Sequence, residues 1–275
     1  MRAKVIFLIM LMFSAIAVAV PVKMVMPFER TLDNGNEVFL GTIGPGQTME
    51  IRIEPMVTAG GIYGNGGQYD IAEAADLPAG WSSTPSALYG KPLQVKITAD
   101  KDAPEGEYKS TINVVDEKNG EQLGNVTFFA KINVTWDVLG MDVTPPQATT
   151  GPEQPTEFMI TITNKGSASD TYTVSATGVK RWEFVKSIYV PARSSRTIFY
   201  EITGYEEETY TPTIGVVSVS SQNIHAEKNV SITVRSDLLG DFKATNHGVL
   251  LFPVFEAPIY ALAGIIAAVL GSIGF

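Results

Sequence analysis

The nine residues INVTWDVLG at positions 132–140 return as ITVRSDLLG at positions 232–240, with five of the nine identical. Two further pairs of matches lie upstream in the same order: Trp81 with Trp182, and a YxxTIxV pattern that starts at Tyr108 and again at Tyr210. The offset stays between 100 and 102 residues. The sequence therefore predicts a tandem duplication of a unit of about 100 residues, which is longer than a solenoid repeat and typical of a β-sandwich domain.

Apolar and polar residues alternate along several segments of both units, as expected for strands with one buried face. These segments are 49–53, 93–99, 158–162, 172–176 and 230–234. Glycine, proline and asparagine residues that favour turns separate the segments. We therefore predict an all-β fold of two tandem antiparallel β-sandwiches, with Ile112 and Ile214 buried at matching places.

The stretch NKGSASDTYTV at 164–174, followed by Trp182, resembles the Ig-like domains of the NEW3 type. LPAGW at 77–81 and APEGEY at 103–108 repeat the later part of this pattern in the first unit. The resemblance covers about residues 45–235 and implies that both sandwiches are Ig-like. Domains of this type occur in bacterial and archaeal surface proteins, often next to membrane anchors, and are generally non-catalytic. We expect a prokaryotic, archaeal source.

The N-terminal segment combines positive charge with an apolar run. Arg2 and Lys4 precede residues 5–20, which carry no charge and include small residues at cleavage-like spacing. This is the pattern of a secretory signal peptide. An uncleaved signal anchor is the alternative, because the apolar run approaches the length of a membrane span. In either case the positive charge keeps the N-terminus inside and places the following domains outside the membrane.

Residues 257–275 form a second uncharged run of 19 residues, which is about 28 Å long as a helix. We predict a transmembrane helix over residues 250–275. Small residues recur along it at four-residue spacing and mark a candidate helix-packing face: Ala263, Gly264, Ala267, Ala268, Gly271 and Ser272. Such residues allow a partner helix to approach closely, although small residues are also common in membrane helices generally.

The predicted organisation has five parts. They are a signal peptide or signal anchor at 1–20, Ig-like sandwiches at 25–137 and 141–237, a juxtamembrane linker at 238–249 and a transmembrane helix at 250–275. The predicted location is the cell membrane, with the ectodomain on the extracytoplasmic side.

The composition excludes several classes of function. The net charge is −9, from 20 basic and 29 acidic residues, which argues against nucleic acid as a partner. The chain has no cysteine and two histidines, and no catalytic or metal-ligand motif is present. We therefore expect no enzymatic activity, no catalytic or metal-binding residues and no cofactor.

Two kinds of candidate surface site remain. Asn125, Asn133 and Asn229 each begin an N-x-S/T motif, and strand alternation predicts that all three face outward, where glycosylation is sterically feasible. The first unit also has about eight extra residues in the glycine-rich stretch 59–67. Ile62 and Tyr63 at its centre are a candidate contact with a partner, and a flexible surface loop is the alternative.

Two functional hypotheses follow from these features. In the first, a membrane-anchored glycoprotein presents two Ig-like modules as a binding or spacer surface, with another protein or a surface polysaccharide as partner. In the second, the chain is an accessory subunit of a membrane complex, such as protein translocation or N-glycosylation machinery, docked through its C-terminal helix. The tandem domains favour the first hypothesis, and the C-terminal helix with its small-residue faces favours the second.

Overall fold

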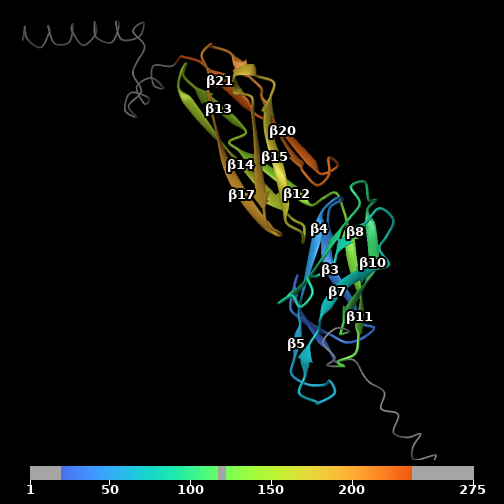
Figure 1. The fold of residues 1–275 in the computed structure, drawn as a ribbon. Helices are drawn as coiled ribbons and strands as arrows, with labels where there is room; N and C mark the ends of the chain where they lie inside the picture. Colours follow the sequence, from blue (N-terminus) through green and yellow to red (C-terminus); the bar gives the residue numbers. More distant parts are fainter. Residues whose placement is uncertain (1–19, 117–121, 237–275) are drawn as a thin grey trace, which may run out of the picture.

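The computed structural model describes residues 20–116 and 122–236. The predicted signal segment, apart from Val20, and the predicted transmembrane segment lie outside the described residues. Within the described ranges the chain is built of strands, with one 3-10 turn at Lys180–Trp182. No helix in these ranges is long and apolar enough to cross a membrane. The strands form two sandwiches arranged end to end (Figure 1).

Domain 1, residues 20–135, packs two sheets around one core. The first sheet has the strand order β2 (Arg30–Leu32), β1 (Val22–Met26), β4 (Thr48–Glu54), β9 (Leu93–Thr98) and β8 (Ser82–Thr84). The second has the order β3 (Glu37–Ile43), β11 (Val126–Val134), β10 (Gly106–Val115) and β7 (Ile71–Ala75). A separate hairpin consists of β5 (Met56–Val57) and β6 (Gly67–Gln68).

Domain 2, residues 138–236, has its own core. One sheet has the strand order β12 (Leu139–Thr144), β14 (Pro155–Asn164) and β17 (Ser194–Thr203). The sheet packed against it has the order β16 (Phe184–Val190), β15 (Asp170–Thr177), β19 (Thr213–Ser218) and β20 (His225–Asn229). A third, small sheet has the order β13 (Gln147–Thr150), β21 (Ser231–Val234) and β18 (Thr209–Tyr210).

The topology of both domains is that of Ig-like sandwiches. In each domain an early strand runs parallel to the last strand, β3 beside β11 and β13 beside β21. The other strand pairs in the described part of the chain are antiparallel. Two mainly antiparallel sheets packed face to face, with sequence-distant strands side by side, define this architecture.

The alternation of the sequence accounts for the two cores. Along β4 the residues Met49, Ile51 and Ile53 are fully buried, and the polar residues between them face outward. Ile112 and Ile214 are also fully buried, one in each core, which confirms their predicted placement. Because side chains on a strand alternate between the two faces, each sheet has an apolar side that packs on its partner sheet.

The repeated aromatic residues form the same corner in both domains. The rings of Trp81 and Tyr108 lie 5.1 Å apart, and those of Trp182 and Tyr210 lie 4.7 Å apart. The Tyr108 hydroxyl donates to the backbone carbonyl four residues earlier at 2.8 Å. The Tyr210 hydroxyl lies 3.5 Å from the corresponding carbonyl. A tyrosine that bonds back to the chain a few residues upstream is a recurring feature of Ig-like sandwiches.

The strand that follows each tryptophan belongs to different sheets in the two domains. In domain 1, β8 pairs with β9. In domain 2, the longer β16 pairs instead with β15, on the other sheet. As a result β9 has a neighbouring strand on both sides, whereas among the described residues β17 has one only on its β14 side.

Candidate functional site

Two turns meet at the joint between the domains. The turn 44–47 of domain 1 connects β3 to β4, and residues 165–169 of domain 2 connect β14 to β15. Gln47 is fully buried here. Its Oε1 accepts a hydrogen bond from the Gly44 N–H at 2.8 Å, and its Nε2 donates to Asp170 Oδ2 at 2.7 Å. One side chain therefore closes the turn and binds the other domain.

Asp170 gathers donors from both domains around a buried carboxylate. It is 4% exposed. Its Oδ2 accepts from Gln47 and from Ser218 Oγ at 2.6 Å, and its Oδ1 accepts from Ser220 Oγ and from the Thr171 N–H, both at 2.8 Å. A buried carboxylate is costly unless donors replace its lost water. Domain 1 supplies one of these donors, so separating the domains breaks a hydrogen bond to a charged acceptor.

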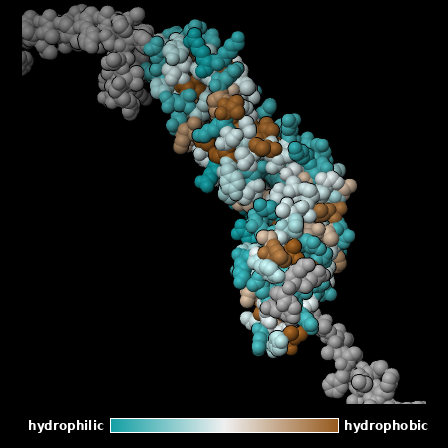
Figure 2. All heavy atoms as spheres, viewed as in Figure 1, coloured by the Kyte–Doolittle hydropathy of each residue, from teal (hydrophilic) through white to brown (hydrophobic). Residues whose placement is uncertain are grey.

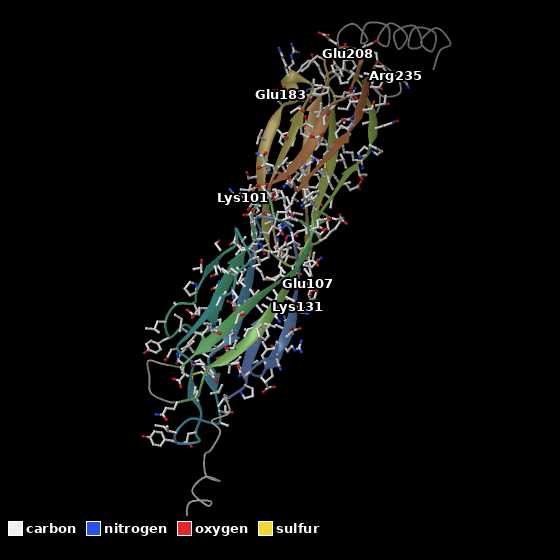
Figure 3. The ribbon with its side chains drawn as sticks, turned by 90° about the vertical axis from the view of Figure 1, so that its right-hand side faces the viewer. Lys101, Glu107, Lys131, Glu183, Glu208 and Arg235 are labelled. Carbon is white, nitrogen blue, oxygen red and sulfur yellow. The ribbon has the colours of Figure 1, made fainter. Side chains whose placement is uncertain are left out.

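Further contacts reinforce the joint. The Ser167 N–H donates to the Thr42 carbonyl at 2.7 Å, and Ser221 Oγ donates to the Lys101 carbonyl at 2.8 Å. Ala168 of domain 2 is buried in the core cluster of domain 1. Figure 3 shows Lys101 where the two domains meet. The joint thus combines apolar packing with hydrogen bonds at several separate positions.

The backbones approach closely at this joint, and glycine makes the approach feasible. A Cβ on Gly46 would lie 2.1 Å from the Ser220 carbonyl oxygen, and Gly46 also has a φ of +68°. A Cβ on Gly44 would lie 2.4 Å from Ile224 Cδ1. A larger residue at Gly46 has to push the domains apart or distort the turn, and a larger residue at Gly44 has to displace the Ile224 and Val138 side chains.

Thr135 and Trp136, which lead from domain 1 into domain 2, are held by hydrogen bonds to residues of domain 1. Glu105 accepts hydrogen bonds from Thr135 Oγ1 at 2.6 Å and from the Trp136 N–H at 2.9 Å. These two donors hold the pKa of Glu105 below its ordinary value. The Thr135 N–H donates to the Ile43 carbonyl at 3.0 Å. These hydrogen bonds hold the linker against domain 1 and so restrict hinge motion between the two domains.

Three buried tyrosines have raised pKa values. Burial raises the pKa of Tyr69 and that of Tyr200 to about 12 each, and the Asp116 carboxylate contributes to the shift at Tyr69. Burial and the neighbouring Asp170 carboxylate raise the pKa of Tyr172. A hydroxyl with a raised pKa stays neutral at physiological pH, so these tyrosines act as uncharged packing groups. The hydroxyls of Tyr69 and Tyr200 also donate hydrogen bonds, to the Val20 and Trp182 carbonyls.

Ile62 and Tyr63, the candidate partner contact, lie in the loop of the β5–β6 hairpin. Their exposed fractions are 50% and 83%. The hairpin projects from the end of domain 1 that points away from domain 2 (Figure 1). Figure 2 shows hydrophobic colouring at this end, and further patches on the visible face of domain 2. The structure thus presents both predicted residues to the surroundings.

The three glycosylation candidates lie on or beside strands, each next to a buried residue. Asn125 and Asn229 are exposed, and Asn133 is half-buried. Ile132, Val134 and Val230 beside them are buried, as the predicted alternation requires. Glycosylation itself stays a prediction.

The predicted helix-packing residues between 263 and 272 lie outside the described residues. The joint, in contrast, is a feature that sequence reasoning missed. Asp170 follows the turn-forming stretch 164–169, and Gln47 follows the turn-forming stretch 44–46, so each is a polar residue next to a turn, where polar residues are common anyway. They are 123 residues apart, and no local pattern signals their contact.

A shallow cavity of about 280 Å³ lies beside the aromatic corner of domain 2. Its walls include Trp182, Tyr205, Tyr210 and Arg181. Trp182 packs on Tyr210, and the Arg181 guanidinium lies 5.5 Å from the centre of the Tyr205 ring. These side chains are therefore engaged in the packing of the domain itself. Across the ranges that the structure describes, no cluster of three or more histidine, aspartate or glutamate side chains could hold a metal ion.

No protein-family model matches the chain. No curated protein matches it either. The solved structures that show distant similarity include the following three. The CARDB domain of a Pyrococcus furiosus protein in complex with di-metal ions is 16% identical, with 35% of this chain and 94% of that chain covered and a TM-score of 0.27. PapD-like domain 7 of human CEP192 is 11% identical, with coverages of 35% and 84% and a TM-score of 0.26. A chimeric titin Z1Z2 is 10% identical, with coverages of 79% and 100% and a TM-score of 0.33. These scores are too low to support an argument about function.

Proposed function

We propose that the chain is a non-catalytic, membrane-anchored extracytoplasmic protein in which two Ig-like domains, held end to end, form a binding or spacer surface. The observation that supports this proposal is the joint. Domains that only need to be tethered are connected by exposed linkers and move relative to each other. Here Gln47 and Asp170 form a buried hydrogen bond between the domains. Such a joint favours a function that needs a fixed distance or orientation.

The membrane attachment is proposed from the sequence. The uncharged run 257–275 is long enough to cross the hydrocarbon core, and residues 5–20 form a second apolar run at the other end of the chain. With the N-terminus inside, the two sandwiches stand outside the membrane. The partner in this proposal is another protein or a surface polysaccharide.

Detergent phase partitioning tests the attachment. The full chain is expected in the detergent phase, and a variant that lacks residues 250–275 and has its signal removed is expected in the aqueous phase as a folded protein, because both cores consist of described residues between 22 and 234. If the full chain, with its signal removed, stays in the aqueous phase as a monomer, the anchor does not exist.

The same preparation separates this function from the alternative of an accessory subunit. Purification in a mild detergent, followed by mass spectrometry, is expected to give the chain without stoichiometric membrane partners. Partners retained at a fixed ratio would favour the complex and its helix-packing residues, Ala263 and those that follow at four-residue spacing.

A further inference from the structure

The β5–β6 hairpin and its loop, residues 56–68, form an uncharged projection that we name the tip hairpin. From Pro55 to Tyr69 the sequence contains no aspartate, glutamate, lysine or arginine. Charged residues make up 18% of the chain, so a stretch of this length would ordinarily hold two or three. The tip hairpin therefore differs from the rest of the chain in that it carries no charged side chain.

The tip hairpin has a defined backbone. Met56 pairs with Gln68, and the Tyr69 N–H donates to the Pro55 carbonyl at 2.9 Å, which closes its base. A Cβ on Gly66, where φ is +76°, would lie 2.0 Å from a backbone oxygen across the loop, so this turn requires glycine. The loop therefore holds its apolar side chains in a set place.

Three apolar side chains project from this frame. Met56 and Ile62 are each 50% exposed, and Tyr63 is 83% exposed. Aliphatic and tyrosine side chains together are typical of surfaces that sit at the boundary between water and lipid, where tyrosine keeps its hydroxyl in the headgroup region. A protein partner would usually be matched by charged groups at the rim, and the tip hairpin offers none.

The chain enters domain 1 directly beside the tip hairpin. A Cβ on Gly60 would lie 2.2 Å from Val20 Cγ2, which shows how closely the Val20 side chain packs on the Gly60 backbone. The Tyr69 hydroxyl donates to the Val20 carbonyl at 2.7 Å, and the Val20 N–H lies 3.3 Å from the Leu123 carbonyl. The residues that precede Val20 are uncharged back to Val5. Val20, the last residue of this uncharged run, and the apolar loop thus meet at one end of domain 1.

We propose that residues 1–20 are retained as a signal anchor and that the tip hairpin rests on the bilayer that this anchor enters, with Ile62 and Tyr63 in the headgroup region. The proposal rests on the proposed function in one respect, the membrane location of the chain. Domain 2 is then the part held away from the membrane.

The first test is the mass of the protein purified from membranes. Retention of the anchor predicts a chain that still contains residues 1–19. Cleavage after one of the small residues near position 19 would overturn the proposal, and it would leave the membrane attachment through residues 250–275 untouched.

The second test measures the contact itself, and the absence of cysteine makes the chain a clean background for it. Full-length Tyr63→Cys protein, labelled with an environment-sensitive fluorophore, is reconstituted in phosphatidylcholine vesicles that contain a lipid-borne quencher. Phe199→Cys is the matched control, because Phe199 is also apolar and 64% exposed but lies on β17 of domain 2. Glu208→Cys probes the far end of domain 2, where Figure 3 places Glu208 beside Arg235.

The proposal predicts a blue-shifted emission and strong quenching at position 63, with neither effect at positions 199 and 208. Quenching at 208 without quenching at 63 would overturn it and would place domain 1 away from the membrane, as the C-terminal anchor alone implies. Cross-linked dimers through position 63, without lipid contact, would assign the tip hairpin to a second copy and also overturn it. A chain that does not stay with the vesicles at all would instead refute the proposed function.

Discussion

Replacing Gln47 with methionine removes the amide that joins the two domains and keeps a side chain of similar length. The substitution removes a 2.7 Å hydrogen bond to a charged acceptor and leaves the buried Gly44 N–H without its 2.8 Å partner. A hydrogen bond to a charged group contributes about 1.5–3 kcal/mol, and an unsatisfied buried donor costs about 1–3 kcal/mol. We expect the free energy of unfolding to fall by about 3–5 kcal/mol.

A double-mutant cycle isolates the part of this loss that belongs to the joint. In the Asp170→Ala background the charged acceptor is already absent, so Gln47→Met should cost about 1.5–3 kcal/mol less than in the natural chain. The assay is urea unfolding of residues 20–236, which contain both cores. Ile214→Val is the control partner, since it is buried in the core of domain 2, and its effect should add to that of Gln47→Met within about 0.5 kcal/mol. Additive effects of Gln47→Met and Asp170→Ala would refute a stabilising joint.

Three further predictions concern the individual domains. Ile112→Ala or Ile214→Ala should each lower the free energy of unfolding by about 2–5 kcal/mol, measured by calorimetry, because each residue is fully buried in a core; an unchanged melting temperature would show that the strand faces are assigned wrongly. Hydrogen bonds from Lys109 and Lys131 lower the pKa of Glu37, so its contribution to stability is present above pH about 4.5 and disappears as the pH falls through the lowered pKa. The melting temperature of Glu37→Gln should therefore fall less between pH 6 and pH 3 than that of the natural chain, and equal slopes would contradict this. Burial raises the pKa of Tyr200 to about 12, so its contribution to the free energy of unfolding is complete below pH about 10 and is lost as the pH rises through 12. The free energy of unfolding of Tyr200→Phe should therefore fall less with rising alkaline pH than that of the natural chain. An equal fall in the two proteins would count against this.

The strands and the two-domain organisation could be predicted because they depend on local patterns. Period-two alternation at residues such as Met49, Ile51 and Ile53 is enough to define a buried face. The repeat of Trp81 and Trp182 indicated two related units, and the structure places each tryptophan against a tyrosine at the same corner. These features follow from side chains that are close in sequence or repeated at a constant offset.

Pairing between distant strands could not be predicted in the same way. An alternating strand buries one face equally well in either sheet, so the sequence of β16 does not reveal that it joins β15 whereas β8 joins β9. Sheet membership depends on loop lengths and on contacts that form only in the folded chain.

The joint could not be predicted from the sequence, for a related reason. Gln47 lies in a turn and Asp170 begins β15, and their burial arises because two domain ends meet. Most of the tip hairpin, in contrast, was visible in the sequence as a glycine-rich insertion at 59–67. Its exposure was expected from that composition, but its position beside Val20 required the fold.

The central claim is that the joint holds the two domains in one fixed arrangement, and a distance distribution between them tests it most directly. Spin labels at Glu107→Cys in domain 1 and Glu183→Cys in domain 2 are suitable, because the chain has no cysteine of its own and Figure 3 places the two residues in different domains. Pulsed electron paramagnetic resonance on the full-length protein should give a single narrow distribution that broadens in the Gln47→Met variant. A broad distribution in the natural chain, unaffected by that substitution, would contradict the account.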